Sequence, residues 1–265
     1  MRIASLLFIA LIFFSFTGEH PKNDLANENL KGRVKEIIDS DFTTFDTTFQ
    51  SDEKNIKFQK KEWKNICVSM YDMKGNLFEM DGYTEEGDTG ISKRSINYNQ
   101  NGRIIETSSN GTHNAESAIC LFKYDSKGNL IEETVHSITD SGTVYCFYTY
   151  DNSGNMIQMK RKILNDTTKI ENCYYKYDNH NNIIEVVSYW LDSPKDINKS
   201  KYKYDNKGNE IEVLMYRNAS TDSIQSTRFY KYIAFDKSGN WVEREEYSSN
   251  ISQEGVLHIR KIKYY

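Results

Sequence analysis

A short motif, Tyr-Asp-x-x-Gly-Asn, recurs at nearly constant intervals along most of the chain. The copies begin at Tyr71, Tyr98, Tyr124, Tyr150, Tyr177, Tyr204 and, with Phe in place of Tyr, at Phe235. The intervals between them are 27, 26, 26, 27, 27 and 31 residues. Self-similarity at such a period is typical of a repeat array, in which each unit packs against its neighbours. The repeat therefore constrains the fold far more tightly than the function.

The centre of each repeat predicts a tight hairpin turn. With the tyrosine as position 0, Asp or Asn stands at +1, and Gly stands at +4 in every copy except one, which has Asn181. An Asp side chain can accept bonds from backbone amides ahead of it, and Gly, or less readily Asn, adopts the positive φ that closes the loop. The turn residues are expected to be Asp72, Gly75, Asp125, Gly128, Asp151, Gly154, Asp178, Asn181, Asp205, Gly208, Asp236 and Gly239.

The flanks of the turn alternate as β-strands do. Positions −4, −2 and 0 are mostly apolar, as in Cys146, Tyr148 and Tyr150, whereas position −1 is mostly polar. After the turn, position +7 is Phe, Ile or Val and position +8 is Glu or Gln. Pairing symmetric about the turn would set −2 opposite +7 on one buried face. In the sixth repeat, Lys201 and Lys203 are then expected to face Glu212 and Glu210.

These features predict an all-β fold, an antiparallel array of about eight hairpins and sixteen strands with a period of 26–27 residues. Residues 30–38 and 57–71 are expected to form a degenerate first hairpin, and residues 258–265 a final strand. The sheet is expected to be twisted, curved or spiralling. A single sheet cannot bury a face alone, so this one is expected to curl on itself or to dock on a partner.

The N-terminus predicts export. Met1 and Arg2 precede an apolar run over residues 3–17, which suits a signal peptide and is shorter than the ~20 residues of a spanning helix. We expect a signal peptide over residues 1–18, a flexible lead-in over 19–29 and the repeat domain over 30–265, with no transmembrane span in the mature chain. An uncleaved N-terminal anchor is the alternative. The expected location is periplasmic, cell-surface or secreted.

The charge pattern argues against nucleic acid as a partner. The formal net charge is −4, and Lys and Glu are interspersed without a basic block. Four cysteines in an exported protein suggest disulfides, but all of them, Cys67, Cys120, Cys146 and Cys173, occupy position −4. In an antiparallel array these positions lie two strands apart, about 9.6 Å, which is too far for a disulfide. We therefore expect no disulfide, and buried thiols beside the +9 residues Met80, Glu133, Met159 and Val186.

Catalytic and metal signatures are missing from the sequence. The glutamate row at +8 repeats one environment, whereas acid–base catalysis needs carboxylates whose environments differ. Each turn offers one carboxylate, fewer ligands than calcium collects. The histidines fall at unrelated offsets, and no HExxH, GxSxG, P-loop or paired CxxC motif occurs. We expect no enzymatic activity, no catalytic residue, no metal and no cofactor.

The connections opposite the turns vary in length and composition, which favours that edge as the binding edge of the array. They are predicted as loops over residues 84–90, 108–116, 137–142, 165–169, 192–199, 217–227 and 248–255. Aromatic side chains near these variable loops are the candidate ligand-binding residues: Tyr83, Tyr189, Trp190, Tyr216 and Tyr247. Plain solvent loops are an equally good interpretation. The tyrosines at −2 and 0 are better explained as a cross-strand aromatic ladder than as sugar-stacking surfaces.

The unit Y-D-x-x-G-N-x-I-E resembles the YD repeat of the RHS family of bacterial secreted and surface proteins, over residues 30–265. The resemblance implies a long antiparallel sheet of hairpins in an exported bacterial protein. Large members use such sheets as shells around toxic C-terminal domains, and related repeats are linked to carbohydrate binding. This chain has too few repeats for a large shell, and it resembles small stand-alone repeat proteins.

The sequence is consistent with two functions. The first is an exported, non-catalytic binding or scaffold module that engages a glycan or a cell-envelope protein through its variable-loop edge. The second is a structural or interaction protein that associates through its sheet face or an open edge strand, or a remnant of an RHS-type shell. The oligomeric state does not follow from the sequence.

Overall fold

The computed structural model describes residues 30–46, 58–84, 92–111, 117–138, 142–164, 166–217, 223–249 and 254–265. The predicted signal peptide and lead-in lie outside these ranges. Among the described residues there is no helix of the length and hydropathy required to cross a bilayer.

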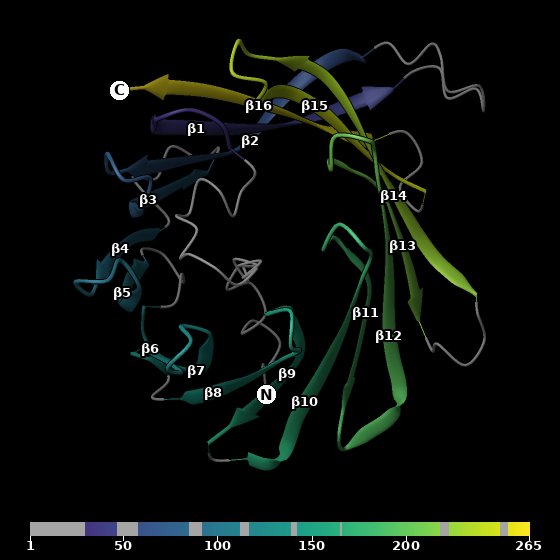
Figure 1. Ribbon diagram of the computed structural model, residues 1–265. Coiled ribbons are helices and arrows are strands. Elements are labelled where there is room, and N and C mark those ends of the chain that lie inside the picture. The colour runs from purple at the N-terminus through teal and green to yellow at the C-terminus, as the bar shows by residue number, and fades with distance from the viewer. Residues whose placement is uncertain are drawn as a thin grey trace.

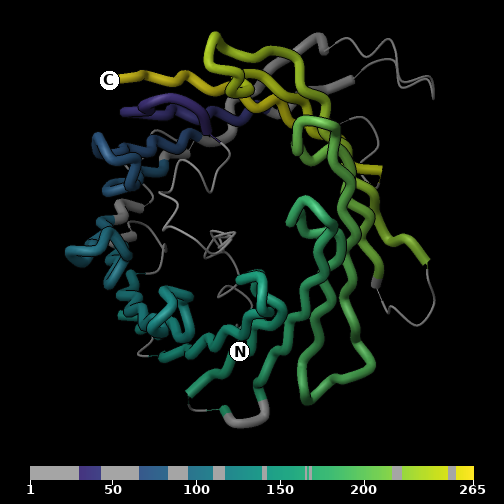
Figure 2. Tube along the Cα trace, viewed as in Figure 1, coloured from purple at the N-terminus to yellow at the C-terminus, as the bar shows by residue number. Residues whose placement is uncertain are grey.

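Sixteen antiparallel strands form one closed barrel (Figure 1). The strands are β1 (Val34–Asp46), β2 (Phe58–Tyr71), β3 (Leu77–Thr84), β4 (Ser92–Tyr98), β5 (Ile104–Gly111), β6 (Ala118–Tyr124), β7 (Leu130–Ser137), β8 (Thr143–Tyr150), β9 (Met156–Ile163), β10 (Asp166–Tyr177), β11 (Ile183–Trp190), β12 (Ser193–Tyr204), β13 (Glu210–Arg217), β14 (Ile224–Phe235), β15 (Trp241–Ser248) and β16 (Glu254–Tyr264). Each strand pairs with its neighbours in sequence, and β1 pairs with β16. Figure 2 shows the resulting ring end-on. The expected all-β antiparallel array is confirmed, and it closes completely.

The turns close on a repeated set of hydrogen bonds. In the third repeat, Oδ1 of Asp125 accepts from the backbone N–H of Asn129 at 2.8 Å, and Oδ2 accepts from its side-chain amide at 3.0 Å. The backbone N–H of Gly128 donates to the carbonyl oxygen of Asp125 at 3.1 Å. The closing residue has positive φ in every repeat, including Asn181 at 64°. The side chains of Asp at +1 and Asn at +5 bond to each other in this way in five of the seven turns.

A β-bulge follows each turn, and it corrects the predicted register. Tyr124 pairs with Leu130, but Lys123 pairs with Glu132, so Ile131 at +7 has no partner across the ladder. Position −2 therefore faces +9, as in the pair of Phe122 with Glu133, and the expectation that it faces +7 is wrong. An extra residue in one strand of an antiparallel pair lets two successive side chains point to the same side.

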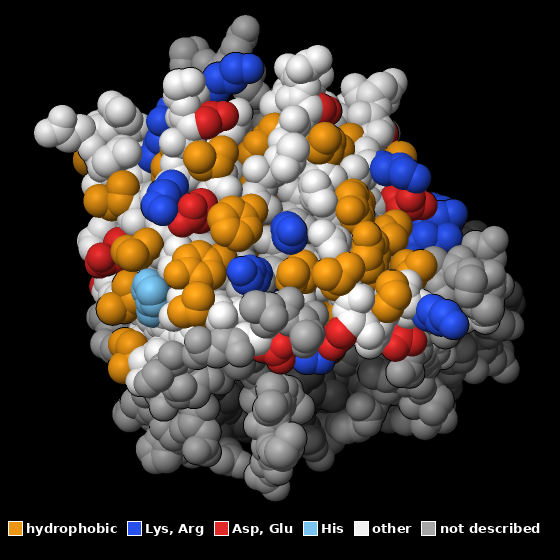
Figure 3. All heavy atoms as spheres, turned by 90° about the horizontal axis from the view of Figure 1, so that it is seen from below, with side chains coloured by type: hydrophobic (Ala, Val, Ile, Leu, Met, Phe, Trp, Pro, Cys, Tyr) orange, Lys and Arg blue, Asp and Glu red, His pale blue; other side chains and the backbone are white. Residues whose placement is uncertain are grey.

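Because of the bulge, the repeat positions that lie on the inner and outer faces of the wall differ from those expected from the sequence. Position +6 is buried in the first three repeats, at Leu77, Ile104 and Leu130. Position 0 is buried at Tyr71, which is 1% exposed, and partly buried in the next five repeats. Position +7, expected to be buried, is instead on the outer face, where Ile131 is 40% exposed. The glutamates at +8 lie beside it and pair with lysines at −1, as in Lys123–Glu132 at 2.6 Å. The outer wall thus mixes apolar side chains with ion pairs (Figure 3).

The same register corrects the expected charge pairs in the sixth repeat. Lys203 contacts Glu212 at 2.8 Å, whereas Lys201 lies opposite Leu214 on one side and Glu185 on the other. Glu210, the expected partner of Lys203, pairs with Tyr204. The bulge shifts every contact on the far side of the turn.

The tyrosines at position 0 tie neighbouring repeats together. The hydroxyl of Tyr124 donates to the carbonyl oxygen of Ile104 at 2.8 Å, and that of Tyr150 donates to Leu130 at 2.9 Å. Equivalent bonds join further repeats through Tyr98, Tyr177, Tyr204 and Tyr232. Each acceptor is the +6 residue of the preceding repeat. The bond satisfies a carbonyl beside the bulge and fixes the spacing of successive hairpins.

Cys120, Cys146 and Cys173 are buried on the inner face and Cys67 is partly buried, and none of these four described residues forms a disulfide. The register places Cys146 opposite Glu133 and Cys173 opposite Met159, the +9 residues of the preceding repeats. These thiols therefore lie beside +9 residues, as expected, and Cys146 and Cys173 pack in one cluster with Met159 and Val186. Burial raises the pKa of the Cys146 and Cys173 thiols to about 12, which keeps them protonated.

The edge opposite the turns contains more strand than expected. Residues 192–199, predicted as a loop, lie mostly in β12, and β10 and β14 begin inside the other predicted loops 165–169 and 217–227. Several of the remaining connections lie outside the described residues. At the variable edge, the strands of some hairpins therefore run into segments that were expected to be loops.

The seam between β1 and β16 joins the two ends of the array without a covalent link. Their register runs from Val34 opposite Tyr264 to Phe45 opposite Glu254. Among the described side chains, three ion pairs cross it: Lys263–Glu36 at 2.6 Å, Arg260–Asp39 at 2.7 Å and His258–Asp41 at 2.7 Å. The hydroxyl of Tyr265 also donates to the carbonyl oxygen of Tyr71 at 2.7 Å, which ties the end of the chain to β2.

Replacing a turn aspartate should weaken the barrel at neutral pH more than in acid. Burial opposes ionisation of Asp125, but hydrogen bonds from Asn129, Gly128 and Lys127 outweigh it and lower its pKa. The stability it contributes is therefore present above the unfolded pKa of about 3.9 and lost as the pH falls through the lower folded value. We expect Asp125→Ala to reduce the free energy of unfolding by about 1–2 kcal/mol at pH 7.

Urea unfolding at pH 7 and pH 3 measures this effect, and the Ala deficit should shrink at the lower pH. Asp125→Asn is the matched control, because Asn99 fills this position in the second repeat and its Oδ1 accepts the same backbone bonds. Equal losses for Ala and Asn would contradict the account.

The seam should weaken as the pH rises. Burial disfavours the charged His258 ring, and Arg244 opposes it too, but hydrogen bonds to Asp41 and Glu246 raise its pKa. A raised folded pKa gives stability that is complete below the unfolded value of about 6.5 and lost as the pH rises through the folded value. The midpoint of thermal unfolding should therefore fall as the pH increases from 6 to 9.

His258→Gln should flatten that dependence, and His136→Gln, on β7 away from the seam, should leave it unchanged. An unaltered pH profile in His258→Gln would show that this histidine does not stabilise the seam.

A candidate binding pocket beside the seam

The inner +6 row changes character in the last two repeats. Five members are aliphatic: Leu77, Ile104, Leu130, Met156 and Ile183. The sixth and seventh are Glu210, which starts β13, and Trp241, which starts β15. A carboxylate and an indole therefore occupy positions where the other repeats place core side chains.

The longer interval before Phe235 disrupts the pairing at the same place. Two register shifts occur between β14 and β15, one between Tyr232 and Ala234 and one between Ala234 and Phe235. Tyr232 takes over the ladder contact, because its hydroxyl donates to the carbonyl oxygen of Glu210 at 3.1 Å. Ile233 is left 44% exposed. The seventh turn is thus displaced from the regular repeat.

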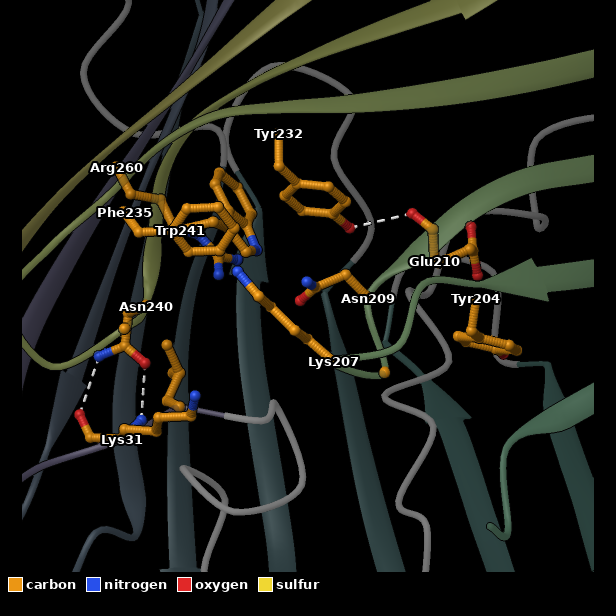
Figure 4. A pocket seen from close by; sticks show the side chains of 13 residues that line it. Lys31, Tyr204, Lys207, Asn209, Glu210, Tyr232, Phe235, Asn240, Trp241 and Arg260 are labelled. Atoms are coloured by element: carbon orange, nitrogen blue, oxygen red, sulfur yellow. Dashed lines mark hydrogen bonds between the residues drawn. The ribbon is translucent and has the colours of Figure 1, made fainter. Parts of the chain in front are cut away.

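A pocket of about 560 Å³ lies where these departures meet, and we call it the seam pocket. Its lining comes from the turns after β12 and β14, the starts of β13 and β15, Arg260 on β16 and the residues before β1 (Figure 4). The lining residues are Leu30, Lys31, Tyr204, Lys207, Gly208, Asn209, Glu210, Tyr232, Phe235, Gly239, Asn240, Trp241 and Arg260. The pocket therefore lies at the turn edge of the array, not at the variable edge.

Asn240 fixes the N-terminal side of the pocket. Its side chain accepts from the backbone N–H of Lys31 at 2.7 Å and donates to the carbonyl oxygen of the same residue at 2.8 Å, as the dashed lines in Figure 4 show. It also donates to the hydroxyl of Tyr264 at 2.8 Å. Only 3% of Asn240 is exposed. A buried amide with these partners holds the start of the barrel domain against the seventh turn.

Aromatic rings form one wall of the pocket. Tyr232 stacks on Phe235 with ring centroids 6.0 Å apart and meets Trp241 edge-on at 6.3 Å. The guanidinium of Arg260 lies 3.7 Å from the Trp241 ring centroid, and that of Arg244 lies 4.5 Å from it. Cation–π contacts of this kind orient the cation and the ring together.

A network of charges supports this part of the inner wall. Glu246 forms an ion pair with Nε of Arg228 at 2.9 Å and contacts Nε2 of His258 at 3.2 Å. Burial opposes ionisation of Glu246, but His258 and Arg228 outweigh it and lower the pKa of the carboxyl. Burial raises the pKa of Glu210, and the nearby Arg244 and Arg228 offset that effect only in part. Ionisation of the Glu210 carboxyl in the pocket wall is therefore unfavourable.

The residues predicted from the variable edge do not assemble into one site. Tyr189 stacks on Tyr174 at 6.2 Å, whereas the Trp190 ring lies under Arg161 at 5.1 Å. Tyr216 is covered by Lys199 and Lys201 and is only 9% exposed. Tyr247 donates to the Glu245 carboxylate, and Tyr83 lies in β3. These side chains are spread over four strands.

The seam pocket was not among the sites expected from the sequence, although three signals for it were present. Glu210 and Trp241 interrupt an otherwise aliphatic position, and the 31-residue interval marks an irregular repeat. A third signal is Arg244 at +9, where Val186 and Val213 stand in the two preceding repeats. Departures from a repeat consensus point to the site better than aromatic residues near loops.

The arrangement is suited to binding. Glu210 is the one carboxylate in the lining described here, whereas paired acid–base chemistry uses two. The described residues contain no cluster of metal-ligating side chains. A concave site with an apolar wall and a few converging polar groups is the usual form of a small-molecule site.

Comparison with known proteins places the fold and leaves the family open. No family model matches the chain, and no curated protein matches it. A crystal structure of a porin-like protein from Bacteroides uniformis is similar with a TM-score of 0.54 at 10% identity, covering 88% of this chain and 98% of that one. At this identity the likeness concerns the fold alone.

Weaker likenesses involve much larger chains. A crystal structure of TcdB2-TccC3 is similar with a TM-score of 0.35 at 14% identity, covering 82% of this chain and 11% of that chain. A Tc holotoxin pore from Photorhabdus luminescens gives a TM-score of 0.35 at 14% identity, covering 85% of this chain and 16% of that chain. This chain therefore spans a small part of each of those proteins.

Restoring the repeat consensus at Glu210 should stabilise the barrel. Its raised pKa means that ionisation costs stability as the pH rises toward neutrality, and Glu210→Leu removes that cost. We expect the free energy of unfolding to increase by about 1 kcal/mol at pH 7, and by less at pH 4. Urea unfolding at both values measures it.

Glu212→Leu, on the same strand but on the outer face, is the control and should change stability little, because an exposed ion pair contributes at most about 1 kcal/mol. A loss of stability in Glu210→Leu would mean that the carboxylate holds the arginines of the inner wall in place.

Proposed function

We propose that the protein is an exported, non-catalytic binding module that holds a carbohydrate ligand in the seam pocket. The observation that carries this proposal is the coincidence of the pocket with the breaks in the repeat at Glu210, Phe235 and Trp241. A repeat needed only for the wall would keep the aliphatic row intact. Half-buried charge that costs stability is typical of functional sites.

The chemistry of the lining supports a sugar as the ligand. Sugars present apolar C–H faces together with many hydroxyl groups. The pocket offers aromatic rings at Tyr204 and Tyr232 and polar groups at Asn209 and Glu210. Its volume of about 560 Å³ falls within the usual range for small-molecule sites.

The cell envelope or its surroundings is the proposed location. The apolar run over residues 3–17 supports export. The fold is similar to that of a porin-like protein, but the outer wall carries Lys–Glu pairs at 2.6–2.8 Å beside the turns of several repeats. In addition, Lys160 is exposed in the middle of β9, opposite the exposed Phe147, and a lysine facing the middle of a bilayer costs about 2–4 kcal/mol. We therefore favour a barrel surrounded by water in the envelope.

Association through the outer wall is the second candidate, and a specific observation favours it. Phe147 is 41% exposed and stacks on Tyr145 at 6.3 Å, and Leu121 and Ile131 are exposed on the neighbouring strands. Pairing of β1 with β16 leaves no free edge strand in the closed ring, so association would use this wall and not strand addition. Mass measurement by light scattering over a range of concentrations tests it.

Binding to a panel of bacterial and host polysaccharides tests the main proposal. We expect saturable binding by the wild type, and loss of at least tenfold in affinity in Trp241→Leu and Glu210→Leu, which restore the consensus residue type. Trp190→Ala and Tyr189→Ala, at the variable edge, should bind as the wild type does. Circular dichroism verifies that every variant is folded.

Loss of binding in the variable-edge variants with retention in the pocket variants would move the site back to that edge. An absence of binding across the panel would contradict the carbohydrate proposal.

A further inference from the structure

We infer that the seam pocket recognises an acidic sugar, and that Lys31, Lys207 and Arg260 bind its carboxylate. This inference rests on the proposed function, because it names the ligand class of the same pocket. It follows from the charges that line the pocket and from the partners that those charges have.

Arg260 is held in one orientation with donors to spare. Its Nε donates to Oδ1 of Asp39 at 2.7 Å across the seam, and its guanidinium lies on the Trp241 ring at 3.7 Å from the centroid. The side chain is only 15% exposed. Neither of its two Nη atoms donates a hydrogen bond to another described residue. A planar guanidinium fixed at one edge and one face presents its remaining donors in a geometry that suits a carboxylate.

Lys207 and Lys31 add two more cations, both beside the seventh turn. The Lys207 ammonium lies 5.1 Å from the Phe235 ring centroid and makes no ion pair with a described residue. The Lys31 side chain lies against the seventh turn, where its Nζ comes within 3.3 Å of the place where a Cβ would stand on Gly239. Its ammonium likewise has no ion pair within the described ranges.

The charge balance of the lining differs from that of the rest of the chain. The lining contains three cationic side chains and one carboxylate, whereas the whole chain has a formal net charge of −4. Lysines at −1 on the outer wall are neutralised by glutamates, as in Lys176–Glu185 at 2.6 Å. Arg260 is paired with Asp39, but the two lysines have no described carboxylate partner, so the charge around the pocket stays positive. A concave site with an excess of one charge focuses its field on a ligand of the other sign.

Glu210 then sets which anion fits. The Glu210 carboxylate lies in the same pocket as the three cations, so it favours an anionic ligand that also carries hydroxyl groups. Those hydroxyls can donate hydrogen bonds to Glu210 while the cations bind the ligand's negative charge. A uronic acid has both features on one ring. A small inorganic anion has only the charge and gains nothing from the aromatic wall.

Titration calorimetry with a trimer of galacturonic acid and with the matched neutral galactose trimer tests the inference. The wild type should bind the acidic trimer at least tenfold more tightly, and raising the salt concentration should reduce only the acidic interaction. Lys207→Gln and Lys31→Gln should each weaken acidic binding about tenfold, since each change removes a charge-assisted hydrogen bond to the ligand. Both lysines are exposed, so the variants should fold.

Lys127→Gln is the matched control. It occupies the same turn position in the third repeat as Lys207 does in the sixth, away from the seam pocket. Its affinity for the acidic trimer should equal that of the wild type. Inorganic phosphate serves as the charge-only probe and should bind at least tenfold more weakly than the acidic trimer.

The outcomes separate this inference from the proposed function. Equal binding of both trimers, lost in Trp241→Leu, would overturn the acidic-sugar inference and leave the carbohydrate pocket standing. Phosphate binding as tight as that of the acidic trimer would also overturn it, because the sugar ring would then contribute nothing. Binding of neither trimer would overturn this inference, and the polysaccharide panel would decide the proposed function separately.

Discussion

Pairing of β1 with β16 is the constraint on which the rest of this structure depends. An antiparallel sheet has two edges, each with a row of unpaired backbone donors and acceptors, and closure is the arrangement that removes both. The hairpins can be extended one at a time by local turns, but the seam must be made between residues more than 200 positions apart. Its ion pairs therefore supply the specificity that a covalent turn supplies elsewhere: Lys263–Glu36, Arg260–Asp39 and His258–Asp41.

The local chemistry of the repeat was readable from the sequence, and its register was not. The Asp and Gly positions indicate the turns, and alternation indicates strands, because both depend on nearest neighbours along the chain. The bulge after each turn depends on how two strands share one extra residue, so Ile131 was expected inside and lies outside. Closure escaped prediction for a related reason. Nothing in a single repeat states how many strands complete a ring.

The candidate site shows the same division. Aromatic residues near the variable loops were reasonable candidates on composition, but the fold distributes them over several strands and covers their rings with neighbours such as Arg161 and Lys199. The seam pocket arises where the repeat is imperfect, at Glu210 and Trp241, and where the two ends of the array meet. A repeat protein can vary such positions without losing its wall, because the other repeats maintain the tyrosine ladder and the turns.

Zero-length carbodiimide cross-linking followed by peptide mass spectrometry tests the closed barrel most directly. It joins a lysine to a carboxylate only when the two are in contact, and Lys263 is exposed enough to react. The hairpin pairs Lys123–Glu132 and Lys203–Glu212 are internal positive controls. The account predicts a Lys263–Glu36 link in the monomeric fraction at a yield similar to theirs. Hairpin links without the Lys263–Glu36 link would show an open sheet and would contradict both the barrel and the pocket beside its seam.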